Sequence, residues 1–259
     1  MSRALCGLGV MIGMPGKLQG VCGIASPGKH CLDSRMAVFR EIHCWIDPLA
    51  RDGARAMAVD EWLCGVAKVP VLRVYRWDGD WASVGYFGGL AAAMARIDCP
   101  NWVRRMTGGG VVDHRVDWTY SLVVPADDPL AKLRGDASYR MIHDAVARVL
   151  RGEGVACGLS SGAEVGGEAL CFANPVDHDV TGPGGEKLAG AGQRRSREAL
   201  LHQGSVALPL DGEASRSRGR ALADVLADRV EEVDLKPDDA TVEHLVQVRY
   251  ADEGWLQRR

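Results

Sequence analysis

The sequence contains no apolar run that approaches the roughly 20 residues needed to cross a bilayer. It also has no surplus of one charge, because 31 Lys and Arg residues stand against 34 Asp and Glu residues. This balance excludes a global field that would draw the protein onto nucleic acid or an acidic membrane. The 8 cysteines are irregularly spaced without a CxxC motif, which argues against a zinc site or a disulfide framework. We therefore expect a cytoplasmic protein with no metal site and no nucleic-acid or membrane partner.

Aromatic side chains are scarce, with 3 Phe and 5 Tyr, whereas glycine is abundant, with 32 residues. With 47% hydrophobic residues over a length of 259, this composition favours an enzyme with a sizeable core and several glycine-built loops over a helical bundle. Residues 1–37 show no sustained periodicity, so we interpret them as a disordered or spurious N-terminal extension, with Met36 as a candidate start. Residues 38–259 are expected to form a single domain.

The pattern becomes regular from Val38 onward. Apolar residues at helical spacing predict a helix over Arg51–Ala67, with Asp60 on the side away from the core. Another helix is predicted over Tyr139–Leu150, with Ser138 as its N-cap. The remaining predictions are strands over 71–77, 81–87, 102–107, 119–124 and 200–208, a hairpin of 177–181 and 186–192 around the turn 182–185, and helices over 220–233 and 240–250, the latter capped by Asp238 or Asp239. Because strands mostly follow strands, the sequence predicts an α+β fold with a mixed, largely antiparallel sheet flanked by helices.

The densest chemical signal is the stretch from Arg104 to His114, in which Gly108, Gly109 and Gly110 follow a predicted strand. Successive glycines let the backbone approach a ligand and turn its N–H groups toward an anion, and the two arginines before them add positive charge. Such a loop can hold a phosphate or a carboxylate. The alternative is a glycine-rich hairpin loop with solvated arginines.

A lysine and a cysteine give two further signals. Lys187 enters a predicted strand that continues through small residues, Gly190 and Ala191 among them, which leaves room for a ligand chain against bare backbone. Cys171 precedes the predicted hairpin, and the hairpin can fold both groups onto one pocket. A neighbouring cation would lower the pKa of the thiol and activate it as a nucleophile. The alternatives are a solvated lysine and a buried, inert cysteine.

These motifs together carry a resemblance to a known family. The motifs are Arg104-Arg105-x-Thr107-Gly108-Gly109-Gly110-x-x-x-His114, Cys171-Phe172, Lys187-x-x-Gly190-x-x-Gln193-Arg194 and His202-x-Gly204. They resemble the catalytic domain shared by lipoate-protein ligases, octanoyltransferases and, more distantly, biotin-protein ligases. The resemblance extends from Asp47, where it implies an opening helix, to Trp255. It implies the biotin/lipoate protein ligase type of α+β fold, so that 38–259 would be one acyl-transfer catalytic domain.

The resemblance also implies a set of site residues. Cys171 and Lys187 would be catalytic, and the substrate would be bound by Arg104, Arg105, Thr107, Gly108, Gly109, Gly110, His114, Gly190 and Ala191. The region from Asp113 to Trp118 departs from the family's usual His-Asp-x-Gly pattern. Beside this site Arg194, Arg195 and Arg197 form a basic cluster that we expect to dock acidic carrier proteins, the alternative being a solvated strand end.

Two branches of the family compete for the activity. The Cys171-Phe172 pair indicates an octanoyltransferase that moves an octanoyl or lipoyl group from acyl carrier protein, through a cysteine thioester, to a lysine of a lipoyl domain or glycine-cleavage H protein. That branch needs no cofactor. The run Gly108–Gly110 is usual in ligases, which would use ATP and Mg²⁺ to form lipoyl-adenylate. A non-catalytic acyl- or biotin-binding module is a third possibility, and an amidotransferase acting between proteins is a fourth.

Overall fold

The structure is a computed structural model that describes residues 37–134, 136–161 and 176–258, which belong to one compact unit beginning at Ala37. Its main sheet has the strand order β11-β1-β2-β6-β10-β9-β8-β7. Only the pairs β1–β11 and β1–β2 are parallel, so the predicted mixed, largely antiparallel sheet is confirmed. The strands are β1 Ile42–Arg51, β2 Val71–Trp77, β6 Trp118–Pro125, β7 Gly158–Leu159, β8 Val180–Thr181, β9 Lys187–Arg195, β10 Ala199–Val206 and β11 Val230–Glu232.

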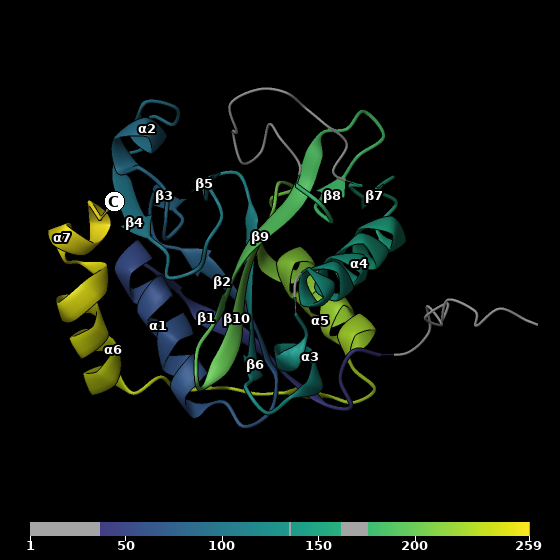
Figure 1. Ribbon diagram of the computed structural model, residues 1–259. Helices are drawn as coiled ribbons and strands as arrows, with labels where there is room; N and C mark the ends of the chain where they lie inside the picture. The colour runs from purple at the N-terminus through teal and green to yellow at the C-terminus, as the bar shows by residue number, and fades with distance from the viewer. Residues whose placement is uncertain (1–36, 135, 162–175, 259) are drawn as a thin grey trace, which may run out of the picture. The chain divides into compact units, whose positions relative to one another are not determined.

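A second, three-stranded sheet has the order β4-β3-β5. Its strands are β3 Trp81–Val84, β4 Asn101–Arg104 and β5 Val111–Asp113, so the glycine-rich stretch connects two of its strands. In Figure 1 this small sheet lies below α2, to the left of the middle of β9. The connection between β4 and β5 thereby reaches the main sheet from one side.

Helices cover both faces of the main sheet, and each face has its own hydrophobic core (Figure 1). Residues alternate between the faces along each strand. On β6, for example, Tyr120 and Leu122 belong to the core under α4 and α5, whereas Val123 belongs to the core under α1 and α6. The helices are α1 Gly53–Val66, α2 Leu90–Met94, α3 Pro129–Lys132, α4 Ala137–Gly152, α5 Gly212–Leu226, α6 Asp239–Leu245, followed by a π-helical turn Val246–Tyr250, and α7 Glu253–Leu256. Within the described residues no helix is long and apolar enough to span a membrane.

The caps that flank the helices follow from short polar side chains. Asp52 precedes α1 and accepts a hydrogen bond from the backbone N–H of Arg55 at 2.8 Å. The predicted cap Asp238 of α6 is confirmed, because its carboxylate accepts from the N–H of Thr241 at 2.8 Å. The predicted cap Ser138 is wrong. It lies inside α4, and its buried hydroxyl bonds to Gln193 instead.

Two segments near the ends of the chain differ from the predicted elements. The opening helix does not begin at Asp47, because 42–51 is strand β1 and the helix begins at Gly53. Pro48 and a register irregularity between Ile46 and Ala50 break the alternation that would have revealed this strand. The predicted helix over 220–233 is also misplaced, since α5 ends at Leu226 and residues 230–232 pair with β1 as β11. A three-residue strand has too short a pattern to be read without its partner.

Candidate active site

A cavity of about 130 Å³ lies on the α1 face of the main sheet, between the sheet and the glycine-rich connection. Its floor is a row of residues paired across four strands, Gly190 on β9, Ser205 on β10, Thr119 on β6 and Tyr75 on β2. Neighbouring strands are about 4.8 Å apart, so this row extends roughly 14 Å across the sheet. Small side chains occupy most of it, which leaves space above the backbone.

The glycine-rich connection packs directly against the sheet beside this row. A Cβ on Gly192 would lie 2.3 Å from the carbonyl oxygen of Gly108, and one on Gly85 would lie 2.0 Å from that of Gly109. Gly109 also has φ +89°, which favours glycine. The glycines are therefore required for the close approach of the two backbones, and Gly109 and Gly110 line the cavity.

A chain of hydrogen bonds fixes the connection from behind. Arg105 donates to the carbonyl of Gly110 at 2.8 Å and to the hydroxyl of Ser83 at 2.5 Å. Ser83 lies 2.6 Å from Nε2 of His114, whose Nδ1 lies 2.9 Å from Asp117. Ser83 was missed from the sequence, because nothing in its spacing connects it to Arg105. The chain thus places the predicted residues Arg105 and His114 at the cavity.

The other predicted residues of this stretch lie outside the cavity lining. Arg104 is fully buried and donates to the carbonyl oxygens of Gly85, Gly88 and Leu256, so it joins the small sheet to the C-terminal segment. Consecutive strand residues point in opposite directions, which explains why Arg104 and Arg105 do not face the same space. Thr107 donates its hydroxyl to Gln203 at 2.7 Å, in the row beside the cavity floor.

The predicted lysine does line the cavity. Nζ of Lys187 lies 2.8 Å from Oδ2 of Asp179, and the side chains are 8% and 0% exposed. A Cβ on Gly190 would lie 2.2 Å from Cε and 2.4 Å from Nζ of Lys187. Gly190 therefore provides the room through which the lysine side chain passes, while Ala191 borders the cavity beside it. Asp179 was not selected from the sequence as a partner of the lysine, although it lies across the predicted hairpin.

The predicted nucleophile Cys171 lies outside the described residues, as does Phe172. Val176, at which the description resumes, lines the cavity. Among the described residues no cysteine lines it. Burial raises the pKa of Cys44 to about 11 and raises that of Cys64 still further, so these thiols stay protonated and unreactive.

Two histidines close in sequence to the predicted hairpin, His178 and His202, also lie away from the cavity. Nε2 of His178 lies 2.5 Å from Asp136 at the start of α4. His202 is fully buried on the opposite face of the sheet, where Nε2 lies 3.1 Å from the hydroxyl of Tyr120, and burial lowers its pKa well below the usual value. Neither imidazole is placed to exchange a proton with a molecule in the cavity.

The predicted basic cluster does not form one surface. Arg194 donates to the carbonyl of Met106 at 3.2 Å, on the cavity face of the sheet. Arg195 points to the other face and donates to the hydroxyl of Ser138 at 2.7 Å, while Arg197 is exposed in the turn after β9. Alternation along β9 separates the neighbours. Of the three arginines, only Arg194 lies on the cavity face of the sheet.

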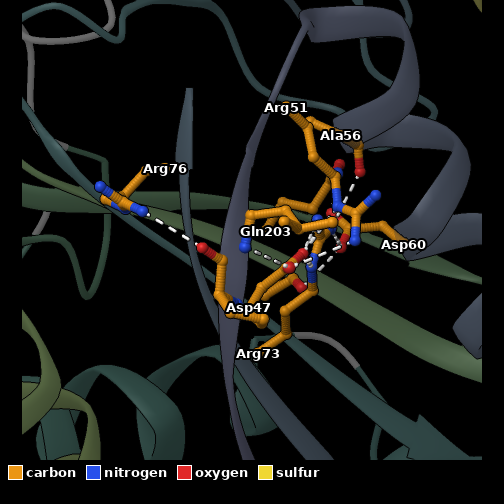
Figure 2. A network of polar contacts seen from close by, with 10 residues as sticks. Asp47, Arg51, Ala56, Asp60, Arg73, Arg76 and Gln203 are labelled. Atoms are coloured by element: carbon orange, nitrogen blue, oxygen red, sulfur yellow. Dashed lines mark hydrogen bonds and ion pairs between the residues drawn. The ribbon is translucent and has the colours of Figure 1, made fainter. Parts of the chain in front are cut away.

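A buried charge network borders the cavity floor (Figure 2). Arg73 is fully buried and lies 2.7 Å from Asp60 and 2.8 Å from Asp47. Asp60 also accepts from Ser121 at 2.7 Å and from Gln203 at 2.8 Å. The prediction that Asp60 points away from the core is wrong. The Asp60 carboxylate is buried, and its charge is compensated by the Arg73 guanidinium in place of water. The sequence did contain a signal for this ion pair: Asp60 and Arg73 are charged residues within segments that are otherwise largely apolar.

Among the described residues, one group of carboxylate and imidazole side chains lies close enough together to hold a metal ion. This group consists of Glu41, His43 and Glu231, at the β11 edge of the main sheet, and none of its members lines the cavity. Glu41 is engaged by Arg229, which lowers the pKa of the carboxyl through their hydrogen bond. The cavity itself is bordered by the Lys187 ammonium with its Asp179 partner, by Arg105 and by the backbone of Gly109 and Gly110, an arrangement suited to a carbonyl or acyl group.

Comparison with solved structures defines the class of this fold. A bi-partite lipoate protein ligase from Thermoplasma acidophilum has a TM-score of 0.63 and 19% identity, covering 86% of this chain and 97% of that chain. A lipoate-protein ligase A bound with ATP has a TM-score of 0.62 and 20% identity, covering 86% and 99%. The fold is therefore that of lipoate-ligase catalytic domains, which confirms the fold implied by the sequence motifs.

Sequence comparison gives the family. Residues 52–247 match the family profile described as the lipoyl protein ligase A/B catalytic domain, and the chain belongs to this family. The octanoyltransferase LipM of Clostridioides difficile is 33% identical over 174 residues, which cover 62% of this chain and 64% of that protein. LipM of Brevibacillus brevis is 27% identical over 267 residues, covering 81% and 96%. The chain spans less than two thirds of the length of the first of these relatives.

Proposed function

We propose that this protein is a cytoplasmic acyltransferase that moves an octanoyl or lipoyl group from acyl carrier protein to a lysine of a lipoyl domain or glycine-cleavage H protein. The observation that carries the proposal is the cavity, in which a row of small residues ends at the Lys187 ammonium. An eight-carbon chain extends roughly 9 Å. It fits along the 14 Å row with its carbonyl at the lysine.

The reaction divides into two transfers. In the first, the Cys171 thiolate attacks the carrier thioester, a new thioester forms on Cys171, and the carrier thiol leaves with a proton. In the second, the amine of the acceptor lysine attacks this thioester, an amide forms, and the Cys171 thiol is released. Lys187 and backbone N–H groups of the glycine-rich connection stabilise the oxyanion in both steps. Removing one such donor costs about 3 to 4 kcal/mol of transition-state stabilisation in other enzymes.

Chain length supports the role of Cys171. It lies five positions before Val176, which borders the cavity. An extended chain of this length reaches at most about 17 Å. This length of chain permits the thiol to reach an acyl group in the cavity. Relatives named octanoyltransferase support octanoyl transfer as the reaction.

Mass spectrometry of the intact protein tests the proposal. After incubation with octanoyl acyl carrier protein and no nucleotide, we expect a gain of one octanoyl group, located on Cys171 by peptide mapping. The Cys171→Ser variant should show no such gain and should lose transfer to a lipoyl domain. Cys157→Ser is the matched control, because Cys157 is half-buried and lies away from the cavity.

A ligase is the second candidate, because one structural neighbour is a lipoate-protein ligase bound with ATP. Incubation with lipoate, ATP, Mg²⁺ and a lipoyl domain distinguishes the two. Modification of the lipoyl domain under these conditions alone, with Cys171→Ser fully active, would reject the thioester route. Binding of the acyl group without modification of any acceptor would reject both enzymes in favour of a binding module.

A further inference from the structure

The hydroxyl of Tyr139, in the first turn of α4, stands at the open edge of β9. Strand β8 pairs with β9 only as far as Ala189, so the next outward-facing backbone groups of β9, at Ala191, have no strand beside them among the residues that the structure describes. The Tyr139 hydroxyl accepts from the N–H of Ala191 at 3.0 Å, and the Ala191 carbonyl oxygen is 3.3 Å away. One phenol thus takes the place of a strand partner at the cavity wall.

The same hydroxyl donates to Asp179, the partner of the lysine. The distance to Oδ1 of Asp179 is 2.6 Å, while Oδ2 receives the Lys187 ammonium at 2.8 Å. Burial and the neighbouring Asp179 carboxylate hold the pKa of Tyr139 far above its usual value, so the phenol remains a donor. The N–H of Val176 also donates to Oδ2 at 2.8 Å, so the carboxylate is held from two sides.

We infer that Tyr139 is a positioning residue for Lys187. It fixes the Asp179 carboxylate relative to the β9 backbone, and the carboxylate fixes the ammonium over Gly190 at the cavity. The hydroxyl ties both partners of the ion pair to one strand, because Ala191 and Lys187 belong to β9. The catalytic part of this inference rests on the proposed function, since it takes the ammonium to stabilise the acyl carbonyl as it becomes an oxyanion.

Tyr139→Phe removes the hydroxyl and keeps the ring. We expect kcat for octanoyl transfer to fall on the order of 10- to 100-fold, the loss that a small misplacement of a catalytic group produces. The KM for the acyl donor should change less than about twofold, because the cavity floor is untouched. Tyr120→Phe is the matched control. Tyr120 is a buried tyrosine on the same side of the sheet, and its hydroxyl bonds to His202 without touching the ion pair.

Trace acetylation with acetic anhydride provides a readout that does not depend on transfer. The acetylation of Lys187, relative to exposed Lys68 in the same digest, should rise severalfold in Tyr139→Phe and stay at the wild-type value in Tyr120→Phe. A merely structural role would change both lysines together or both variants alike. If Tyr139→Phe does not fold, Tyr139→Met removes the same hydroxyl, fills the space with a flexible apolar side chain and should raise Lys187 labelling in the same way.

Unchanged Lys187 labelling in a folded Tyr139→Phe protein would overturn the inference, even if kcat fell. An unchanged kcat in a protein that transfers octanoyl would overturn it as well. The absence of transfer by the wild-type protein would reject the proposed function, while the labelling still decides whether Tyr139 positions the lysine.

Discussion

Replacing Asp60 with asparagine tests whether the buried charge network supports the sheet beneath the cavity. Asp60 is fully buried and receives hydrogen bonds from Arg73, Ser121 and Gln203 (Figure 2). Asparagine has the same shape, but one of its ends is a donor that meets another donor. Arg73 would then keep only Asp47 as a charged partner.

The magnitude follows from the loss of one partner in a buried ion pair, which costs about 3 to 5 kcal/mol. Because Arg73 retains Asp47, we expect the lower end, about 3 kcal/mol. For a domain of this size each kcal/mol lowers the unfolding midpoint by about 2 to 4 °C. The Asp60→Asn variant should therefore unfold roughly 6 to 12 °C below the wild-type protein.

Urea unfolding and thermal unfolding measure this difference. The control is Glu243→Gln, which breaks an ion pair with Arg55 whose side chains are 47% and 48% exposed. Such exposed pairs contribute less than about 1 kcal/mol. A loss in Asp60→Asn that is below 1 kcal/mol, or equal to that in Glu243→Gln, would refute the idea that the network stabilises the fold.

Two other predictions concern the roof of the cavity and the opposite face of the sheet. Gly192→Ala should displace the glycine-rich connection at Gly108 and lower octanoyl transfer at least tenfold. Gly89→Ala is the control and should leave transfer unchanged, because the space around a Cβ at position 89 is open. Equal activity in the two variants would contradict the packing argument. Burial lowers the pKa of His143 to about 4, while the unfolded chain takes up a proton near pH 6.5. The free energy of unfolding should therefore fall as the pH drops from about 6.5 to about 4, and His143 should contribute roughly 3 kcal/mol to this fall. Urea titrations at several pH values measure the dependence, and a His143→Gln variant should lose the contribution of this group. The same slope in the variant would contradict the assignment.

The elements with local signals were predictable from the sequence. Helix α1 and strand β2 lie within two residues of their predicted bounds, and Gly182–Gly185 is a turn, with the N–H of Gly182 bonded to Glu186 and Gly185 at φ +83°. The glycine-rich stretch was also found, because three successive glycines have few structural uses other than close backbone approach. The order of the predicted elements gave the α+β class with its largely antiparallel sheet, and the family motifs gave the particular type of that fold.

What could not be predicted depends on contacts between distant segments. Strand β1 is recognisable only beside β2 and β11, and Asp60 is buried only because Arg73 lies on the neighbouring strand. The separation of Arg194 from Arg195 follows from a strand alternation that places each on its own face. Asp179 is a comparable case, since its role appears only when the hairpin places it against Lys187.

The position of the cavity is explained by two neighbouring rows on the same face of the sheet. The row of Gly190, Ser205, Thr119 and Tyr75 forms the cavity floor, and the row two residues further along the strands is Gly192, Gln203, Ser121 and Arg73. Both begin with a glycine on β9, but the second row contains long polar side chains that bond to one another and to Asp60. A charged network of this kind cannot admit an apolar chain without leaving its groups unpaired, so it closes the space on that side. Small side chains in one row and a satisfied polar network in the next together determine where an acyl group can lie.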